Sequence, residues 1–282
     1  MQSIAKFAMR SPLHAIGLSV LSILLGFISW LSPPIVALVL LSKGLREGGN
    51  VFFWTLIPIG IVFHFTGDPT LLFNITSVFL LAFALRNRFS WQHVLVLAFF
   101  FSLIGTLLYH NFASLAFQRL VDFVSQLLNM ISGIPAIQNK DLANIVIFSY
   151  SLQLYFYSIA GICLARWWQS CLYNPLGFGR EFRSLRLHPH ICSIAMLGVI
   201  FCIVFIDRLW LWIPLLASPL FIAALGLMHW VFAAAKISSF WSIGLYVGLL
   251  VALEIFVPLL VSIAIIDSFF DLRSRYKFSN KE

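Results

Sequence analysis

Long apolar stretches separated by short polar loops cover almost the whole chain. A helix that crosses a membrane needs about 20 apolar residues, and fewer where neighbouring helices cover a short one. Stretches of this kind cover 13–31, 51–65, 70–85, 93–110, 142–165, 191–206, 209–235 and 241–266. The pattern predicts an all-α, polytopic transmembrane bundle of about eight or nine spans, some short or broken, in a single membrane domain over 1–282.

Two apolar stretches contain two prolines each, which disturb the regular pattern of spans. The segment "SPPIVALVLL" (32–41) is too short to cross a membrane alone, and Pro33 and Pro34 favour a broken or re-entrant half-helix. The stretch 209–235 contains Pro214 and Pro219, so it forms either one span or a re-entrant hairpin.

Residues 111–140 show a different periodicity, with one polar stripe along a helix. We expect this segment to lie in the membrane–water interface on the outer side of the membrane. There it would either shield the tops of other helices or act as a lid over an outward-facing pocket. The stripe consists of Asn111, Ser114, Gln118, Asp122, Ser125, Asn129 and Ser132, and the opposite side carries Phe112, Ala116, Leu120, Phe123, Leu127 and Ile131.

The composition supports the membrane assignment. Of the 282 residues, 61% are hydrophobic and only 10% are charged, whereas soluble domains carry roughly a quarter charged residues. The lipid bilayer is therefore the expected surrounding of the chain. The formal net charge is +8, and the basic residues lie in short loops between apolar stretches. This placement is typical of residues that orient a protein in the membrane, and it argues against a nucleic-acid partner.

The basic loops predict the orientation. Lys and Arg concentrate in loops 42–50, 86–92 and 166–190, and short loops of this kind face the cytoplasm. The side of the C-terminal tail stays open. Counting spans places it outside, whereas Arg273, Arg275 and Lys277 favour the inside.

Signatures of soluble enzymes are absent. The sequence contains no Walker A loop, no HExxH and no GxSxG. Its four cysteines and seven histidines show no spacing typical of a metal site, and Pro189 separates the neighbouring His188 and His190. We therefore assign no catalytic residue, metal or cofactor, and an integral-membrane enzyme ranks third among the function classes because no acid/base pair is identifiable.

Polar residues within apolar spans are costly and point to function. Glu254 falls near the middle of 241–266, and Tyr150, Gln153 and Tyr157 share one helix face. With His229 as a further partner for Glu254, these residues form the predicted ligand-binding set, which would orient the polar end of a ligand among apolar walls. The alternative is that they make interhelical hydrogen bonds that only fix packing.

The longest polar stretch is "YNPLGFGREFRSLRLHPH" (173–190) in the predicted loop 166–190. Gly177 and Gly179 predict sharp bends, and "REFRSLRL" predicts a short amphipathic helix. Its exposed side chains would dock on anionic lipid or on a partner protein. The docking candidates are Arg180, Phe182, Arg183 and Arg186.

This loop carries a resemblance to a known family. The pattern Tyr-Asn-Pro-x-Gly-Phe-Gly-x-Glu-Phe-x-x-Leu-Arg-Leu, which begins at Tyr173, resembles the YybS-like family of bacterial inner-membrane proteins, a domain of unknown function. The basic "KGLREGG" loop (43–49) before a helical hairpin is similar to that family too, and distantly to the substrate-binding membrane components of energy-coupling-factor transporters. The resemblance implies a multi-pass protein of the bacterial inner membrane.

Two function hypotheses follow. The first is an inner-membrane protein that binds or transports a small, partly apolar molecule or lipid. The second is a non-enzymatic scaffold that self-associates as a homo-oligomer, or docks a cytoplasmic partner through loop 166–190.

Overall fold

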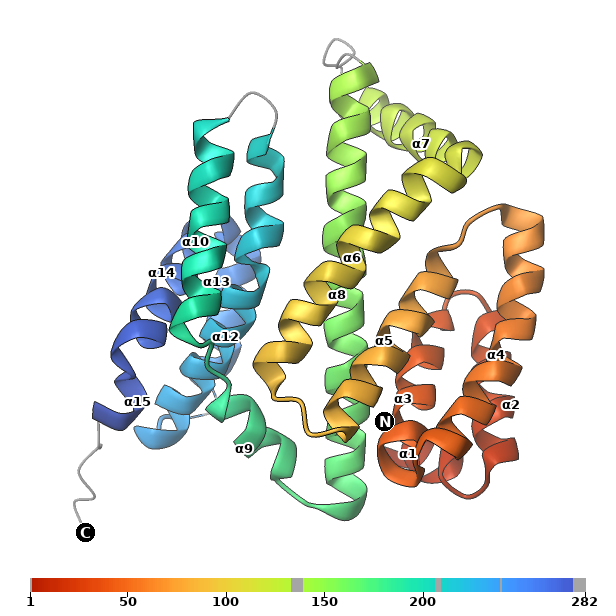
Figure 1. Ribbon diagram of the computed structural model, residues 1–282, viewed down its shortest axis with the longest axis horizontal. Coiled ribbons are helices and arrows are strands. Elements are labelled where there is room, and N and C mark those ends of the chain that lie inside the picture. Colours follow the sequence, from red (N-terminus) through yellow and green to blue (C-terminus); the bar gives the residue numbers. More distant parts are fainter. Residues whose placement is uncertain (1, 133–138, 206–208, 239, 276–282) are drawn as a thin grey trace. The chain divides into compact units, whose positions relative to one another are not determined.

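Every secondary-structure element in the computed structural model is a helix, over the described residues 2–132, 139–205, 209–238 and 240–275. The chain forms two compact units, Met1–Leu176 (unit 1) and Gly177–Glu282 (unit 2) (Figure 1). The all-α prediction is confirmed for the described residues.

Unit 1 contains eight α-helices and one short 3-10 helix within the described residues. They are α1 (Gln2–Ala8), α2 (Pro12–Leu24), η1 (Ser29–Leu31), α3 (Ser32–Lys43), α4 (Leu45–Thr66), α5 (Thr70–Arg86), α6 (Trp91–Phe112), α7 (Ser114–Ser132) and α8 (Asn139–Tyr173). The described helices of unit 2 are α9 (Gly177–Ser184), α10 (Pro189–Val204), η2 (Trp210–Trp212), α12 (Ile213–Ala234), α13 (Phe240–Val251), α14 (Leu253–Phe270) and α15 (Leu272–Arg275).

Five of the described helical segments are long and apolar enough to cross a membrane, so the chain has the character of a multi-pass membrane protein. Helices α9 and α10 pass the same test together, but they are bent by 60° with respect to each other. The expected count of eight or nine spans is not confirmed. The five segments are Leu45–Thr66, Trp91–Phe112, Asp141–Tyr173, Trp210–Ala234 and Leu253–Phe270.

The first predicted span, 13–31, is instead the outgoing arm of a short hairpin. Helix α2 has 13 residues and ends at Leu24, because Gly26 takes a positive φ of 66° and the chain turns back. Helix α3 returns with 12 residues, so each arm is about 20 Å long at 1.5 Å per residue, shorter than a membrane core of about 30 Å. The segment 32–41, for which the two prolines predicted a broken or re-entrant half-helix, forms the short helix α3, with both prolines in its first turn.

Helix α3 forms the centre of unit 1. All residues from Ser32 to Leu41 are buried, and α2, α4, α5 and α8 pack around them. Gly48 permits the closest of these approaches, since a Cβ atom there would lie 2.5 Å from Leu40 Cα. A larger residue at position 48 would push α4 away from the core.

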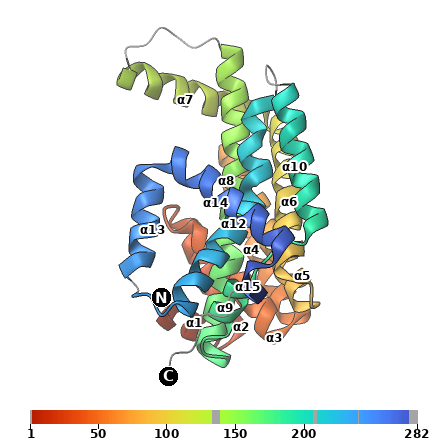
Figure 2. The ribbon, with the colours of Figure 1, turned by 90° about the vertical axis from the view of Figure 1, so that its left-hand side faces the viewer.

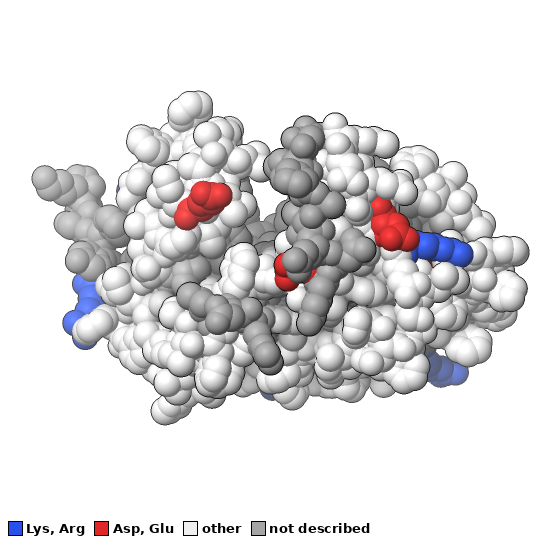
Figure 3. All heavy atoms as spheres, turned by 90° about the horizontal axis from the view of Figure 1, so that it is seen from above, with Lys and Arg blue, Asp and Glu red and all other residues white. Residues whose placement is uncertain are grey.

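The basic loops of unit 1 meet at the C-terminal end of α3. Arg86, the last residue of α5, donates to the carbonyl oxygens of Leu40 and Leu41 at 3.1 and 2.8 Å. Gln169 of α8 donates to the Leu41 carbonyl at 3.0 Å. A cation at a helix C-terminus is stabilised by the helix dipole, so Arg86 caps α3 and brings the α3–α4 junction together with the ends of α5 and α8. Of the predicted loop 42–50, only Gly44 lies outside a helix. Figure 3 looks onto the opposite end of α6–α8, where uncharged side chains predominate.

Helix α7 crosses the ends of α6 and α8 at a steep angle (Figures 1 and 2). Ala116 and Phe117 are buried against these helices, whereas Gln118 and Asp122 are exposed. The amphipathic helix predicted within 111–140 is therefore present, but it begins at Ser114 because α6 continues to Phe112. The remainder of that segment, 133–138, lies outside the described residues.

Unit 2 differs from the sequence expectation at its last predicted span. The stretch 209–235 is one continuous helical segment and not a hairpin, whereas 241–266 breaks at Ala252 (φ −136°, ψ 50°) into α13 and α14. Pro258 has no N–H for the carbonyl of Glu254, which weakens the helix at this point. Gly248 then accommodates the folded-back chain, since its Cβ would lie 2.8 Å from the Phe256 ring.

Candidate functional site

A largely apolar pocket lies in unit 1 where the start of α3 faces the middle of α8. Its cavity volume is about 210 Å³. Tyr157, one of the predicted ligand-binding residues, lines it and lies midway between Asp141 and Tyr173, the ends of the apolar part of α8. The lining residues are Trp30, Pro33, Pro34, Tyr157, Ala160, Gly161 and Leu164.

The α8 wall of the pocket is one helix face. Positions 157, 160, 161 and 164 follow the i, i+3, i+4, i+7 spacing that places side chains on the same side of a helix. Two contacts hold this part of α8 on α5: Ser158 Oγ lies 2.8 Å from Ser77 Oγ, and a Cβ at Gly161 would lie 2.9 Å from Val78. The pocket wall is therefore carried by a helix with a defined position in unit 1.

The opposite wall comes from the proline-rich start of α3. Pro33 and Pro34 occupy the first turn of α3, where proline is tolerated because the first N–H groups of a helix have no helical acceptor. Their rings are rigid apolar groups, and the Trp30 indole adds a rigid ring that carries one N–H donor. Among the described lining residues none is charged, and the Tyr157 hydroxyl is the polar side-chain group opposite this wall.

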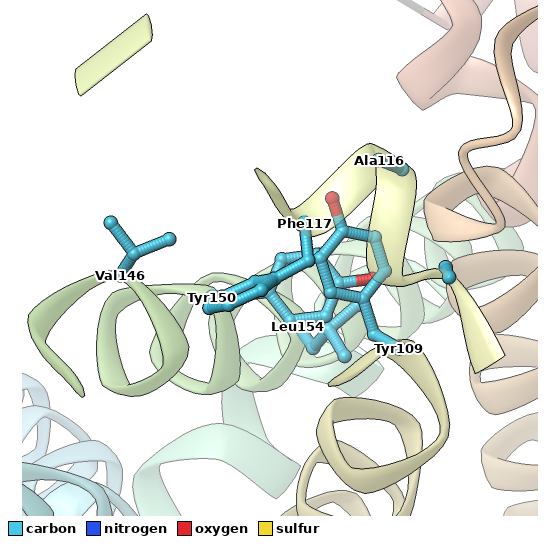
Figure 4. Close-up of a cluster of buried hydrophobic side chains, with 7 residues drawn as sticks. Tyr109, Ala116, Phe117, Val146, Tyr150 and Leu154 are labelled. Carbon is cyan, nitrogen blue, oxygen red and sulfur yellow. The ribbon is translucent and has the colours of Figure 1, made fainter. Parts of the chain in front are cut away.

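Tyr150 belongs to a separate cluster, two helical turns from Tyr157. Its ring stacks on Tyr109 with centroids 4.1 Å apart, and Phe117 of α7 meets the Tyr109 ring edge-on (Figure 4). Tyr150 is only 4% exposed, so α6, α7 and α8 are joined here by aromatic packing. Tyr109 was not among the predicted residues, because nothing in its local sequence distinguishes it from other membrane-interface tyrosines.

The Tyr150 hydroxyl also joins a hydrogen-bond chain to the α4–α5 turn. Both the backbone N–H and the hydroxyl of Thr70 donate to Asp68 Oδ1, at 2.9 and 2.5 Å. Because the Thr70 proton is used in this way, the Tyr150 hydroxyl donates to Thr70 Oγ1 across 3.1 Å. This chain ties the turn to α8.

The other predicted ligand-binding residues do not line the pocket. Gln153 is exposed on α8. His229 and Glu254 belong to unit 2, where His229 Nε2 lies 2.8 Å from the Tyr246 hydroxyl and its ring is 5.7 Å from that of Phe182. Glu254 is exposed in the first turn of α14 and not in the middle of a helix, because the chain breaks at Ala252.

The polar stretch 173–190 differs from the expected loop. Helix α8 continues to Tyr173, and α9 begins at Gly177, so Gly177 and Gly179 are helical. The prediction that these glycines adopt unusual backbone angles is wrong; the left-handed residue is Leu176, with φ 67°. The short helix is present, but it lies at Gly177–Ser184 and ends before Arg186.

Three of the docking candidates, Arg183, Arg186 and Phe182, take part in contacts within unit 2. Arg186 pairs with Asp271 at 2.6 Å and donates to the Ser268 carbonyl at 3.3 Å. The Arg183 carbonyl accepts a hydrogen bond from Arg273. Phe182 is half-buried, and its carbonyl would lie 2.6 Å from a Cβ at Gly226 of α12. Arg180 is exposed.

A buried ion pair adjoins these contacts and was missed by sequence reasoning. Asp267 is 2% exposed and pairs with Arg273 at 3.2 Å, and Arg273 also donates to the Leu185 carbonyl at 2.5 Å. The signal in the sequence is weak: Asp267 directly follows the predicted span 241–266, and Asp271 comes four residues later.

Within the described part of the chain, no three His, Cys, Asp or Glu side chains converge as metal ligands would. The sequence matches no family model, no curated protein and no solved structure in the three comparisons with known proteins.

Proposed function

We propose that this chain is an integral inner-membrane protein of the YybS-like type that binds or transports a small, partly apolar molecule, with the pocket between α3 and α8 as the binding site. The observation that carries the proposal is the pocket itself, whose largely apolar lining includes the Tyr157 hydroxyl and the Trp30 indole as polar groups. Small-molecule sites have this composition, with few polar groups that set the orientation of the ligand.

The position of the pocket favours the same function. Helices α2 and α3 form a short hairpin that begins and ends near basic residues, and the pocket lies at the turn end of α3 and at the middle of α8. With the ends of the apolar part of α8 at the two membrane surfaces, the proposal puts the pocket near the bilayer midplane. Interrupted helices at membrane depth are tolerated where they are buried in protein or line a cavity, and many transporters place their sites at such interruptions.

The scaffold hypothesis receives less support. It depends on free arginines in 173–190, and Arg186 is paired within its own unit. The cytoplasmic orientation of the basic loops and a bacterial inner-membrane location remain part of the proposal, since they rest on charge distribution and resemblance.

A pocket-filling variant tests the function. Ala160 lines the pocket and is exposed, so Ala160→Phe can occupy the cavity without disturbing the core. Benzene, the simplest apolar probe, is expected to raise the thermal unfolding midpoint of the purified protein and to have no effect on Ala160→Phe. Gln153→Phe, on an exposed position of the same helix, is the matched control and should respond like the wild type. An equal response of Ala160→Phe would contradict the proposal.

A further inference from the structure

Helix α5 ends in a Schellman motif with an arginine at the position that glycine usually occupies. The N–H of Arg88 donates to the Leu85 carbonyl at 3.2 Å, and the N–H of Phe89 donates to the Ala84 carbonyl at 3.1 Å. Arg88 takes a positive φ of 64°. Glycine adopts this conformation readily, whereas a residue with a Cβ atom is strained in it. Arg88 therefore costs this turn some stability that glycine would not.

Helix α12, in the other unit, ends in the same motif with a lysine. The N–H of Lys236 donates to the Ala233 carbonyl at 3.3 Å, and the N–H of Ile237 donates to the Phe232 carbonyl at 2.9 Å. Lys236 has a φ of 52°. In both motifs a cation occupies the left-handed position and an apolar residue follows it. We call Arg88–Phe89 and Lys236–Ile237 the two capping pairs.

Both capping pairs lie just beyond a helical segment that is long and apolar enough to cross a membrane. The segment Trp91–Phe112 begins three positions after Arg88, and the segment Trp210–Ala234 ends two positions before Lys236. Both cations are exposed, and the apolar residues that follow them are 50% and 38% exposed. Each pair therefore combines an exposed cation with an exposed apolar side chain at the depth where lipid headgroups meet acyl chains.

The two cations are available to a partner outside the chain. Among the described residues, neither Arg88 nor Lys236 pairs with an acidic side chain. By contrast, the nearby Arg86 already donates to the carbonyl oxygens of Leu40 and Leu41. The capping of α3 is thus the work of Arg86, and it leaves the charge of Arg88 without an internal use.

The surroundings of both cations favour a negatively charged partner. Where α3 and α5 end, Glu47 is the acidic residue of the described chain, and it already pairs with Lys43 at 3.3 Å. The stretch 209–253 contains Lys236 and no other Asp, Glu, Lys or Arg. A lone cation next to an apolar span gains most from an anion at the membrane surface. The basic residues around the end of α3 are Lys43, Arg46, Arg86, Arg88 and Arg166.

We propose that each capping pair binds a phospholipid with an anionic headgroup. The Arg88 guanidinium and the Lys236 ammonium donate to phosphate oxygens of the headgroup, and Phe89 and Ile237 contact the acyl chains. The proposal is independent of the pocket in unit 1. A cation at a helix end is also favoured by the helix dipole, whatever the lipid, so the two effects have to be separated by a change of lipid.

The test measures the thermal unfolding midpoint of the detergent-solubilised protein with added phosphatidylglycerol, which is anionic, or phosphatidylcholine, which is zwitterionic. The wild type should be stabilised more by phosphatidylglycerol, and high salt should reduce the difference. Arg88→Gly and Lys236→Gly should fold, because glycine suits a positive φ. Each should need about fivefold more phosphatidylglycerol for the same stabilisation, the effect of one cation at an anionic surface. Altered strain and a lost dipole contact act equally in both lipids.

Two further variants serve as controls. Leu176 is exposed and has a φ of 67°, so Leu176→Gly makes the same backbone change without removing a charge. It should respond to phosphatidylglycerol like the wild type. Arg88→Lys keeps the cation and should retain most of the response.

Four results would overturn the proposal. The first is a wild type that responds equally to the two lipids. The second is a full response of Arg88→Gly and Lys236→Gly, which would mean that the cations act on the helix ends alone. The third is an equal loss in Leu176→Gly, which would trace the effect to the backbone. The fourth is an equal stabilisation by inorganic phosphate, which would assign the cations to free anions and not to lipid.

Discussion

Arg186 Nη1 lies 2.6 Å from Asp271 Oδ2, an ion pair that joins the segment after α9 to the residue that ends α14. Arg273 reinforces this connection through the carbonyl oxygens of Arg183 and Leu185, which are 90 and 88 residues away in the sequence. The end of α14 and the start of α10 are therefore at the same end of unit 2. If 166–190 is cytoplasmic, the C-terminal tail leaves unit 2 on the cytoplasmic side, as its arginines favour. Lys277 of the tail lies outside the described residues.

The buried pair of Arg273 and Asp267 predicts a large effect of a single substitution. Arg273→Ala leaves the buried Asp267 carboxylate without its partner, which costs about 3–5 kcal/mol of unfolding free energy. Chemical or thermal unfolding of the detergent-solubilised protein measures this loss. Replacing both residues, as Asp267→Leu with Arg273→Met, should recover most of it, because no unpaired charge remains. A single variant as stable as the exposed control Arg180→Ala would show that the pair is not structural.

The Arg186–Asp271 pair predicts a dependence on acid pH. Partial burial alone would raise the pKa of Asp271, but the adjacent Arg186 guanidinium lowers this pKa below its ordinary value. A carboxyl whose pKa is lower in the folded state stabilises the fold above its unfolded pKa of about 3.9, and this contribution is lost as the pH falls through the lower, folded pKa. Because the pair is partly exposed, the effect is about 1 kcal/mol or less. Unfolding midpoints between neutral and acid pH should fall less steeply in Asp271→Asn than in the wild type, and parallel curves would contradict the assignment.

The hydrogen bond between Tyr150 and Thr70 predicts a moderate effect. Tyr150→Phe keeps the stacked rings but removes the hydroxyl that donates to Thr70. Loss of one buried hydrogen bond costs about 1 kcal/mol. We expect a lower unfolding midpoint for Tyr150→Phe and no change for Gln153→Ala, an exposed position on the same helix. Because Tyr150 is outside the pocket, the binding of benzene should not change in this variant.

Accessibility of introduced cysteines tests the orientation of both units. In a chain without its native cysteines, Leu45→Cys, Arg88→Cys, Arg180→Cys and Ser274→Cys should resist an impermeant thiol reagent added from outside. Phe65→Cys, at the exposed end of α4 away from the basic loops, should react. Reaction at Ser274→Cys alone would place the tail outside and contradict the position that the ion pairs give it in unit 2.

Local patterns in the sequence were sufficient for the helical membrane class, the short helix that begins with Pro33 and Pro34 in its first turn, and the amphipathic helix before 132. Hydropathy, helical periodicity and proline act within a few residues, so these features can be predicted without knowledge of distant contacts. Tyr157 could also be singled out, as a polar residue inside an apolar span.

The pocket, the break at Ala252 and the pairing of Asp267 with Arg273 depended on the tertiary structure. Pro33 and Tyr157 are far apart in the sequence and form one pocket only because α3 packs on α8. Glu254 resembles a mid-span carboxylate in the sequence, but the chain folds back at Ala252 and leaves it exposed at a helix start. Likewise, the sequence predicted a turn at Gly177, but the residue with positive φ is Leu176. Helix α9 already begins at Gly177, and its packing on α12 determines this position. Such features follow from contacts between distant segments, which a local sequence pattern does not contain.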